Sequence, residues 1–361
     1  MIKTLDQYLI KKYLSTFLFA VLIFTLISMA IDFSDKVRHF IEKPCTVGEI
    51  MFDYYPGFVM NMSGLLLPLY VLIAVVFFTS RMAYNAEILS ILNAGVSFPR
   101  LLRPYLIAGS VVALTHLAMN HFLVPIANKS RLKFERAYVW TEQEKGKKSN
   151  VHFLVAPGTK VYIQGYDKNQ KTATGLWLEK FNGNKLVSIL QAKSAAWKGE
   201  PNRWELKNYS IRTFDGMRES YKRYVAPLDT AINLVPQDFI WYHNQNEEMT
   251  SIELKEAIAR DRSRGLLTSR NYEIELHRRT ADAFTILILT IIGLAVAGRK
   301  VRGGMGLHLA IGIGMGAMYI LMSKFAVSFA ASGSIPIALG MWIPNIIFSV
   351  VAVWLVSRAQ K

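Results

Sequence analysis

The chain has 361 residues, 52% of them hydrophobic, and a formal net charge of +16. Its charge is unevenly placed: residues 127–280 hold 45 charged side chains in 154 positions, whereas the other 207 positions hold 23. This division excludes a uniform soluble protein, a disordered chain and a coiled coil, and the single cysteine, Cys45, excludes a disulfide scaffold. It predicts a polar domain inserted into an apolar framework.

Long uncharged runs predict six membrane-spanning helices, since a helix needs about 20 apolar residues to cross a bilayer. The runs cover residues 13–31, 54–80, 104–128, 283–298, 303–323 and 325–357. The last run is too long for one span and contains a breaker cluster from Ser332 to Pro336, so we expect a fifth helix, a tight turn and a sixth helix. We expect the first run to stay as an anchor, because acidic residues rather than a small-residue cleavage site follow it.

The short loops predict the orientation of these spans. With both termini cytoplasmic, the inside segments carry eleven Lys and Arg and the short outside segments carry three, which fits the positive-inside rule. We therefore divide the chain into residues 1–128 with spans one to three, 129–268 as a periplasmic domain, and 269–361 with spans four to six.

The inserted domain has the pattern of an all-β fold. Alternating segments such as 160–164 and 176–180 predict strands, and Asn182-Gly183 and Asp215-Gly216 predict hairpins. Strands at this spacing favour a sandwich or a jelly roll. A helix over about 250–264 is expected to follow, because Thr250 and Glu253 form a capping-box pattern. A second helix is expected from about Ser269 into span four.

Motifs that would carry catalysis are missing from the sequence. No G-x-x-x-x-G-K-[ST] phosphate loop, no G-x-S-x-G nucleophile elbow and no metal-ligand spacing of His and Cys occurs. We therefore expect a chain that is not an enzyme and holds no cofactor of its own.

The segment between spans two and three predicts a short amphipathic helix over about 82–94. Ile88, Ile91 and Leu92 share one helical face, Gly95 is a natural C-terminal stop, and Glu87 is the single acid. An interfacial helix resting on lipid would carry lysines on its polar face. The nearly neutral face favours docking into a protein socket with a basic partner for Glu87.

With these features the sequence resembles the LptF/LptG (YjgP/YjgQ) family of lipopolysaccharide export permeases. The resemblance rests on Leu5-Asp6-Gln7-Tyr8, the segment from Glu87 to Asn93-Ala94-Gly95, the domain inserted after span three, and the turn from Gly333 to Pro336. Tyr272 and Arg299-Lys300 favour the LptG side of the family.

The resemblance implies a function, a location and a set of partners. It implies a permease subunit in the inner membrane of Gram-negative cells, with a jelly-roll-like periplasmic domain, that extracts lipopolysaccharide and passes it to LptC. It implies pairing with a second permease, LptF or LptG, and docking of two copies of the ATPase LptB, which would bind ATP and Mg²⁺. The coupling residues would be Glu87, Ile88, Ile91, Leu92 and Gly95.

Basic residues near the expected outer interface are candidates for binding the lipid's phosphates. They are Lys36, Arg38, Lys129, Arg131, Lys133, Arg136, Arg278 and Arg279, together with Lys324 inside the long apolar run. The alternative is that these cations contact ordinary anionic lipids or snorkel to the headgroups. Asp32 stands where part of the family has a lysine near the end of the first helix. Whether Lys36 or Arg38 takes the role of that lysine is therefore open.

Two other functional classes fit a membrane protein of this kind. A force-transmitting subunit of an ABC-type complex would act on a periplasmic partner without carrying lipid, but such proteins place the large domain after span one of four. A lipid-acting membrane enzyme would need an acid–base cluster at the interface, where Asp32 and Asp35 have no His or metal partner.

Overall fold

The computed structural model describes residues 3–43, 45–140, 149–167, 170–199, 202–239, 244–266, 269–299 and 304–359. The chain forms two compact units. The helical unit comprises Met1–Val139, Asn246–Leu254 and Arg270–Lys361, and the sheet unit comprises Trp140–Gln245 and Lys255–Ser269.

Six helices of the helical unit are long and apolar enough to cross a membrane, which confirms the predicted number of spans. The first span is α1 (Thr4–Glu42), and the second consists of α2 (Val47–Glu49), the π-helical η1 (Ile50–Tyr54) and α3 (Tyr55–Tyr84). The third consists of α5 (Phe98–Ala118), the π-helical η2 (Met119–Leu123), α6 (Val124–Phe134) and the π-helical η3 (Glu135–Val139). The last three are α8 (Ser269–Ala297), α9 (Gly304–Ser332) and α10 (Ile337–Ser357).

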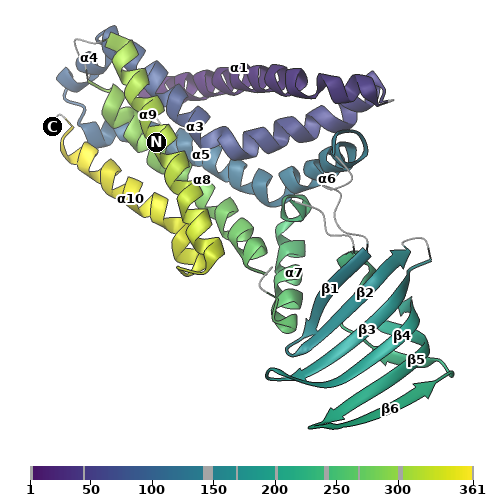
Figure 1. Ribbon diagram of the computed structural model, residues 1–361. Helices are drawn as coiled ribbons and strands as arrows, with labels where there is room; N and C mark the ends of the chain where they lie inside the picture. The colour runs from purple at the N-terminus through teal and green to yellow at the C-terminus, as the bar shows by residue number, and fades with distance from the viewer. Residues whose placement is uncertain are drawn as a thin grey trace. The chain divides into compact units, whose positions relative to one another are not determined.

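Helix α3 is the centre of the helical unit (Figure 1). Its most apolar window is 67% buried inside the chain, whereas that of α1 is only 6% buried. On one side α3 shares a core with α1, α5 and α8, and on the other with α8, α9 and α10. The middle of α1 therefore presents apolar side chains outward, as a helix facing lipid or another chain does.

Several polar side chains inside the bundle are hydrogen-bonded to one another, as expected where no water can replace a hydrogen bond. The hydroxyl oxygens of Tyr13 in α1 and Thr290 in α8 are hydrogen-bonded at 3.0 Å. Those of Thr79 in α3 and Tyr105 in α5 are also hydrogen-bonded at 3.0 Å. Such contacts fix how the helices are rotated about their axes.

The predicted break in the last apolar run is confirmed. Helix α9 ends at Ser332, and Gly333 follows with φ +86°, a left-handed conformation that glycine adopts without steric cost. Pro336 then precedes α10. Helix α9 continues through Lys324, so this lysine does not end a helix.

The short helix between spans two and three is α4 (Glu87–Asn93), which is shorter than the predicted 82–94. Residues up to Tyr84 still belong to α3, and Ala86 with φ 60° separates the two helices. Gly95, with φ +85°, follows α4 as predicted. Pro99 does not delay the next helix but lies in the first turn of α5, where its missing N–H costs nothing.

The sheet unit holds a seven-stranded antiparallel sheet between the third and fourth spans (Figure 1). The strands are β1 (Ser149–Ala156), β2 (Thr159–Asp167), β3 (Thr172–Asn182), β4 (Lys185–Gly199), β5 (Arg203–Asp215), β6 (Arg218–Tyr224) and β7 (Leu228–Ala231). Strands β1 to β6 pair in chain order, and β7 pairs with β5. Both predicted hairpins are present, with Gly183 and Gly216 at positive φ.

One face of the sheet carries the core of this unit. Val161, Ile163, Leu176 and Leu206 are buried there, and the indole of Trp204 donates a hydrogen bond to the Leu234 carbonyl at 2.9 Å. These residues occur at alternate strand positions, as the period of a half-buried strand requires. Strand β6 is exposed at every residue and so has no alternation that would predict it.

The elements after the sheet are the 3₁₀ segments η4 (Pro236–Phe239) and η5 (Gln245–Glu248) and helix α7 (Ser251–Arg264). The predicted capping box is present: Thr250 N–H donates to Glu253 at 2.7 Å, and Gly265 follows α7 with φ +74°. Helix α8 runs from Ser269 directly into the fourth span, as predicted. The predicted boundary at residue 129 lies within α6, because the third span continues helically to Val139.

Candidate functional site

Helix α4 lies at the same end of the helical unit as the start of α1 and the end of α10 (Figure 1). Ile88 is buried, and Ile91 and Leu92 pack against the core shared by α1, α3, α5 and α8. The apolar stripe that predicted a docking face is therefore covered by this chain. The exposed side of α4 consists of Leu89, Ser90 and Asn93.

The carboxylate of Glu87 already has partners inside the chain. The hydroxyl of Tyr8 donates to it at 2.8 Å, and the ammonium of Lys12 donates to its two oxygens at 3.3 and 3.0 Å. Partial burial opposes ionisation, but the hydrogen bonds from Lys12 and Tyr8 outweigh it, so the pKa of Glu87 lies below its usual value. Glu87 is therefore a charged residue bound to α1.

Most of the predicted lipid-binding cations lie at the other end of the helical unit, where α1 ends and α6 passes (Figure 1). Lys36 forms ion pairs with Asp32 at 2.8 Å and with Glu135 at 3.0 Å, and its ammonium also contacts the Tyr54 hydroxyl. Tyr54 in turn donates to Asp32. Asp32, the departure noted in the sequence, thus neutralises the lysine one turn later.

Arg131 is buried in the same group of charges. Its guanidinium contacts Glu135 at 3.3 Å and Glu247 at 3.1 Å, and it donates to the Asn128 side chain at 3.0 Å. Burial raises the pKa of Glu247, although the charge of Arg131 opposes this. These contacts tie η5 to α6 and leave Arg131 little surface for an external anion.

Other cations of this end are paired as well. Lys129 pairs with Glu253 at 2.8 Å, Arg38 with Glu42 at 2.7 Å, and Arg136 with Glu248. Lys133 is exposed, and no ion pair joins it to a residue that the structure describes. Lys133 is therefore available for an anionic ligand. The side chain of Arg38, which is 84% exposed, is accessible as well, whereas Arg136 is mostly covered.

Arg278 and Arg279, near the start of α8, both bind Glu275. Arg279 is buried, contacts Glu275 at 2.9 Å and donates to the backbone carbonyls of Met249 and Asn246. Arg278 contacts Glu275 at 2.8 Å and is 31% exposed. Arg279 therefore fixes the chain before α7, whereas Arg278 keeps part of its guanidinium open.

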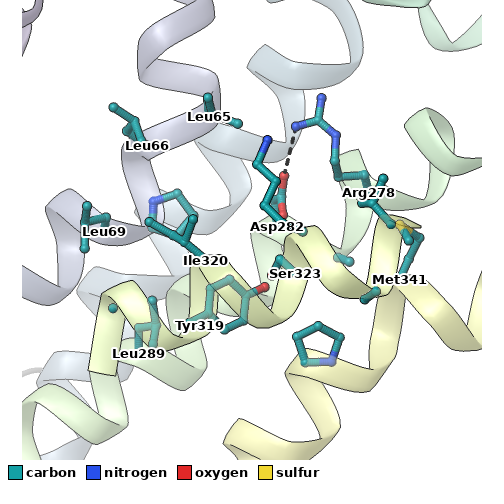
Figure 2. Close-up of a pocket in the computed structure, with 17 residues that line it drawn as sticks. Leu65, Leu66, Leu69, Arg278, Asp282, Leu289, Tyr319, Ile320, Ser323 and Met341 are labelled. Atoms are coloured by element: carbon teal, nitrogen blue, oxygen red, sulfur yellow. Dashed lines mark ion pairs between the residues drawn. The ribbon is translucent and has the colours of Figure 1, made fainter. Parts of the chain in front are cut away.

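Arg278 lines an apolar pocket that lies between α3, α8, α9 and α10 and is open to solvent. Figure 2 shows Arg278 and Asp282 at one end of the pocket, 3.9 Å apart, and Leu69, Leu289 and Tyr319 toward the other. Lys324 also lines it and is exposed, and no ion pair joins it to any residue in the described ranges.

The pocket has the composition of a site for an amphiphile. Leucines and other apolar side chains form most of its wall, and its charged lining residues are the cations Arg278 and Lys324 and the carboxylate Asp282. Hydrocarbon fits the apolar wall, and an anion such as a phosphate fits two cations that can donate several hydrogen bonds. Among the described residues no group of three or more His, Cys, Asp and Glu could hold a metal ion.

The carboxylates at these cations were missed by sequence reasoning, although some had a signal. Arg131 with Glu135, Lys36 with Asp32, and Arg278 with Asp282 are four residues apart, so they meet on one helix face. The pairs with Glu247 and Glu248 join residues more than 110 positions apart, for which the sequence contains no local signal.

Comparison with known proteins agrees with this architecture of six apolar helices and an inserted antiparallel sheet. A search of curated proteins finds no match to the chain. The model of one protein family, the lipopolysaccharide export system permease LptF/LptG, matches residues 7–358, which is nearly the whole length. The chain therefore belongs to the LptF/LptG family of lipopolysaccharide export permeases.

Proposed function

We propose that the chain is a permease subunit of an ATP-driven complex that extracts lipopolysaccharide from the outer leaflet of the inner membrane. The observation that carries the proposal is the family match over residues 7–358, which includes all six apolar helices and the sheet. In this proposal both termini and α4 are cytoplasmic, and the sheet unit lies in the periplasm, where it passes the lipid to LptC.

The motor is proposed to lie on another polypeptide. The sequence has no phosphate-binding loop, and α4 is a short helix of the kind that an ATPase could hold. We infer that two copies of LptB dock at the short cytoplasmic helices of the two permeases, α4 among them, and bind the ATP and Mg²⁺. The exposed residues Leu89, Ser90 and Asn93 would form the contact, and the partner permease would complete the transport path. Tyr272 and Arg299-Lys300 support assignment to the LptG side.

The pocket of Figure 2 is proposed to hold part of the lipid. An acyl chain would occupy the apolar end near Leu69 and Leu289, and a phosphate would contact Lys324 and the open part of Arg278. The contact between Arg278 and Asp282 is long, at 3.9 Å, and therefore weak. A phosphate could replace this carboxylate without breaking the shorter contact of Arg278 with Glu275.

Co-purification tests the proposal. The chain, tagged and extracted from its native membrane in mild detergent, should bring along an ATPase, a second permease of similar size and lipopolysaccharide that mass spectrometry identifies. Purification of a chain that carries phospholipid only and no ATPase would contradict the proposal. If the chain were instead a force-transmitting subunit, the same purification would yield an ATPase without lipopolysaccharide. The lipid content of the purified complex therefore distinguishes the two functions.

A further inference from the structure

The start of α1 is bonded to both sides of the α4 segment. On one side Glu87, the first residue of α4, accepts hydrogen bonds from Tyr8 at 2.8 Å and from Lys12 at 3.0 Å. The Lys12 ammonium also lies 4.4 Å from the centre of the Tyr8 ring, so the two donors support each other. This contact joins residues 75 and 79 positions apart.

The second bond lies just after α4. Arg100, in the first turn of α5, donates a hydrogen bond from each terminal guanidinium nitrogen to one of the two carboxylate oxygens of Asp6, at 2.7 and 2.8 Å. Asp6 is buried and also accepts the backbone N–H of Lys3 at 2.9 Å. A bidentate guanidinium–carboxylate pair holds both distance and orientation, so it resists rotation as well as separation.

The middle of α1 is less restrained than its two ends. Leu9 and Tyr13 are buried, but the most apolar window of α1 is only 6% buried within the chain, the lowest value of the six candidate spans. Moving this part of α1 therefore disturbs little internal packing. The helix is therefore fastened at the α4 end, exposed along its middle, and held again at its far end, where Lys36 pairs with Glu135 and Phe40 is buried.

From these contacts we propose that Tyr8 and Lys12 are positioning residues that make α4 and the start of α1 move as one body. A displacement of α4 by a partner is then passed through Glu87 to α1, whose outward face can shift against lipid or a second chain. The proposal rests on the proposed function, because it takes the partner to be the ATPase. It adds the residues through which the displacement reaches a span.

Substitutions on α1 test this without touching α4. In the complete complex in proteoliposomes, Lys12→Met and Tyr8→Phe should leave assembly and ATP hydrolysis within about twofold of wild type and lower the lipopolysaccharide released per ATP several-fold. Lys12→Arg should restore most of this ratio. Lys11→Met is the matched control, because Lys11 carries the same charge on the next residue and is exposed.

The outcomes separate this inference from the proposed function. An unchanged ratio in Lys12→Met would overturn the inference while leaving the function intact, and so would loss of the ATPase from the complex, since the pair would then serve docking. A wild-type complex that releases no lipopolysaccharide would instead count against the proposed function. Reversing both charges, Asp6→Arg with Arg100→Asp, provides a second test, because each single change should lower the ratio and the double change should recover it.

Discussion

The charged residues of the helical unit differ in whether this chain neutralises them. Of the nine cations predicted to bind lipid, seven have a carboxylate partner within the described residues, and Lys133 and Lys324 have none. A paired and buried cation contributes to the fold, and it can bind a ligand only by giving up that partner. Residue type and expected height in the membrane were therefore insufficient to separate ligand-binding cations from structural ones.

Arg131→Gln is predicted to destabilise the helical unit. Removing one partner of a buried ion pair leaves the other charges uncompensated, and such changes cost about 3–5 kcal/mol. The carboxylates left behind are Glu247 and Glu135, of which Glu135 keeps its ion pair with Lys36. The melting temperature of the purified protein should fall markedly, whereas Lys133→Gln, two positions away and exposed, should leave it unchanged. Equal melting temperatures for the two variants would contradict the structural role of Arg131.

Lys324→Gln is predicted to reduce lipopolysaccharide binding without affecting the fold. Its side chain lines the pocket and is exposed, so its loss removes a cation from the binding surface and breaks no ion pair within the described residues. Photocrosslinking of lipopolysaccharide from a probe next to the pocket should drop several-fold, with the melting temperature kept. Lys11→Gln controls for net charge. Wild-type crosslinking in Lys324→Gln would contradict a role in lipopolysaccharide binding and would indicate that this lysine contacts ordinary lipid headgroups.

The contact of Glu87 with Tyr8 and Lys12 of α1 is predicted to weaken at acid pH. Because Lys12 and Tyr8 hold the pKa of Glu87 below its ordinary value of 4.5, the bond stabilises the fold fully above that pH. It is lost as the pH falls through the lower pKa of the folded protein. The pair is partly exposed, so its contribution is about 1 kcal/mol.

Thermal melting of wild type and Glu87→Gln from pH 7 down to pH 3.5 measures this contribution. Wild type should be the more stable at pH 7, and the difference should shrink below pH 4.5. A difference that stays constant over the whole range would show that ionised Glu87 is not what stabilises the contact.

At the scale of elements, the sequence predicted what depends on local pattern. The six spans follow from long uncharged runs, the break after α9 from Gly333, and the start of α7 from Thr250 with Glu253. The sequence did not predict β6, whose residues are all exposed, or the continuation of the third span to Val139. It also could not show that the apolar stripe of α4 packs against its own chain, because amphipathicity does not say which partner covers a face.

The close contact between α3 and α6 leads to a prediction at this scale. A Cβ at Gly57 would lie 2.6 Å from the carbonyl oxygen of Ala127 and 2.7 Å from the Cβ of Arg131. Gly57→Ala should therefore push the two helices apart and cost about 1–3 kcal/mol of stability. Gly314→Ala is the control, because nothing lies within 4 Å of its added Cβ. A wild-type melting temperature for Gly57→Ala would contradict this packing.

At the scale of the whole molecule, the division of charge seen in the sequence corresponds to two units. The apolar part forms the helical unit, and most of the charged insertion forms the sheet unit, although residues 127–139, 246–254 and 270–280 belong with the helices. Because the positive charge is divided between membrane-spanning helices and the sheet unit, we expect no nucleic-acid partner. At the far end of the helical unit from α4 much of it is balanced by acids, and the cations left open face an apolar pocket or solvent.

The central claim is that this chain moves lipopolysaccharide under the drive of a separate ATPase. The most direct measurement places the purified complex in proteoliposomes loaded with lipopolysaccharide and follows its appearance on a crosslinking acceptor protein after ATP is added. We predict transfer that requires ATP hydrolysis and falls when Lys324 is replaced by Gln. Transfer that is equal with and without ATP, or ATP hydrolysis with no movement of lipopolysaccharide, would contradict it.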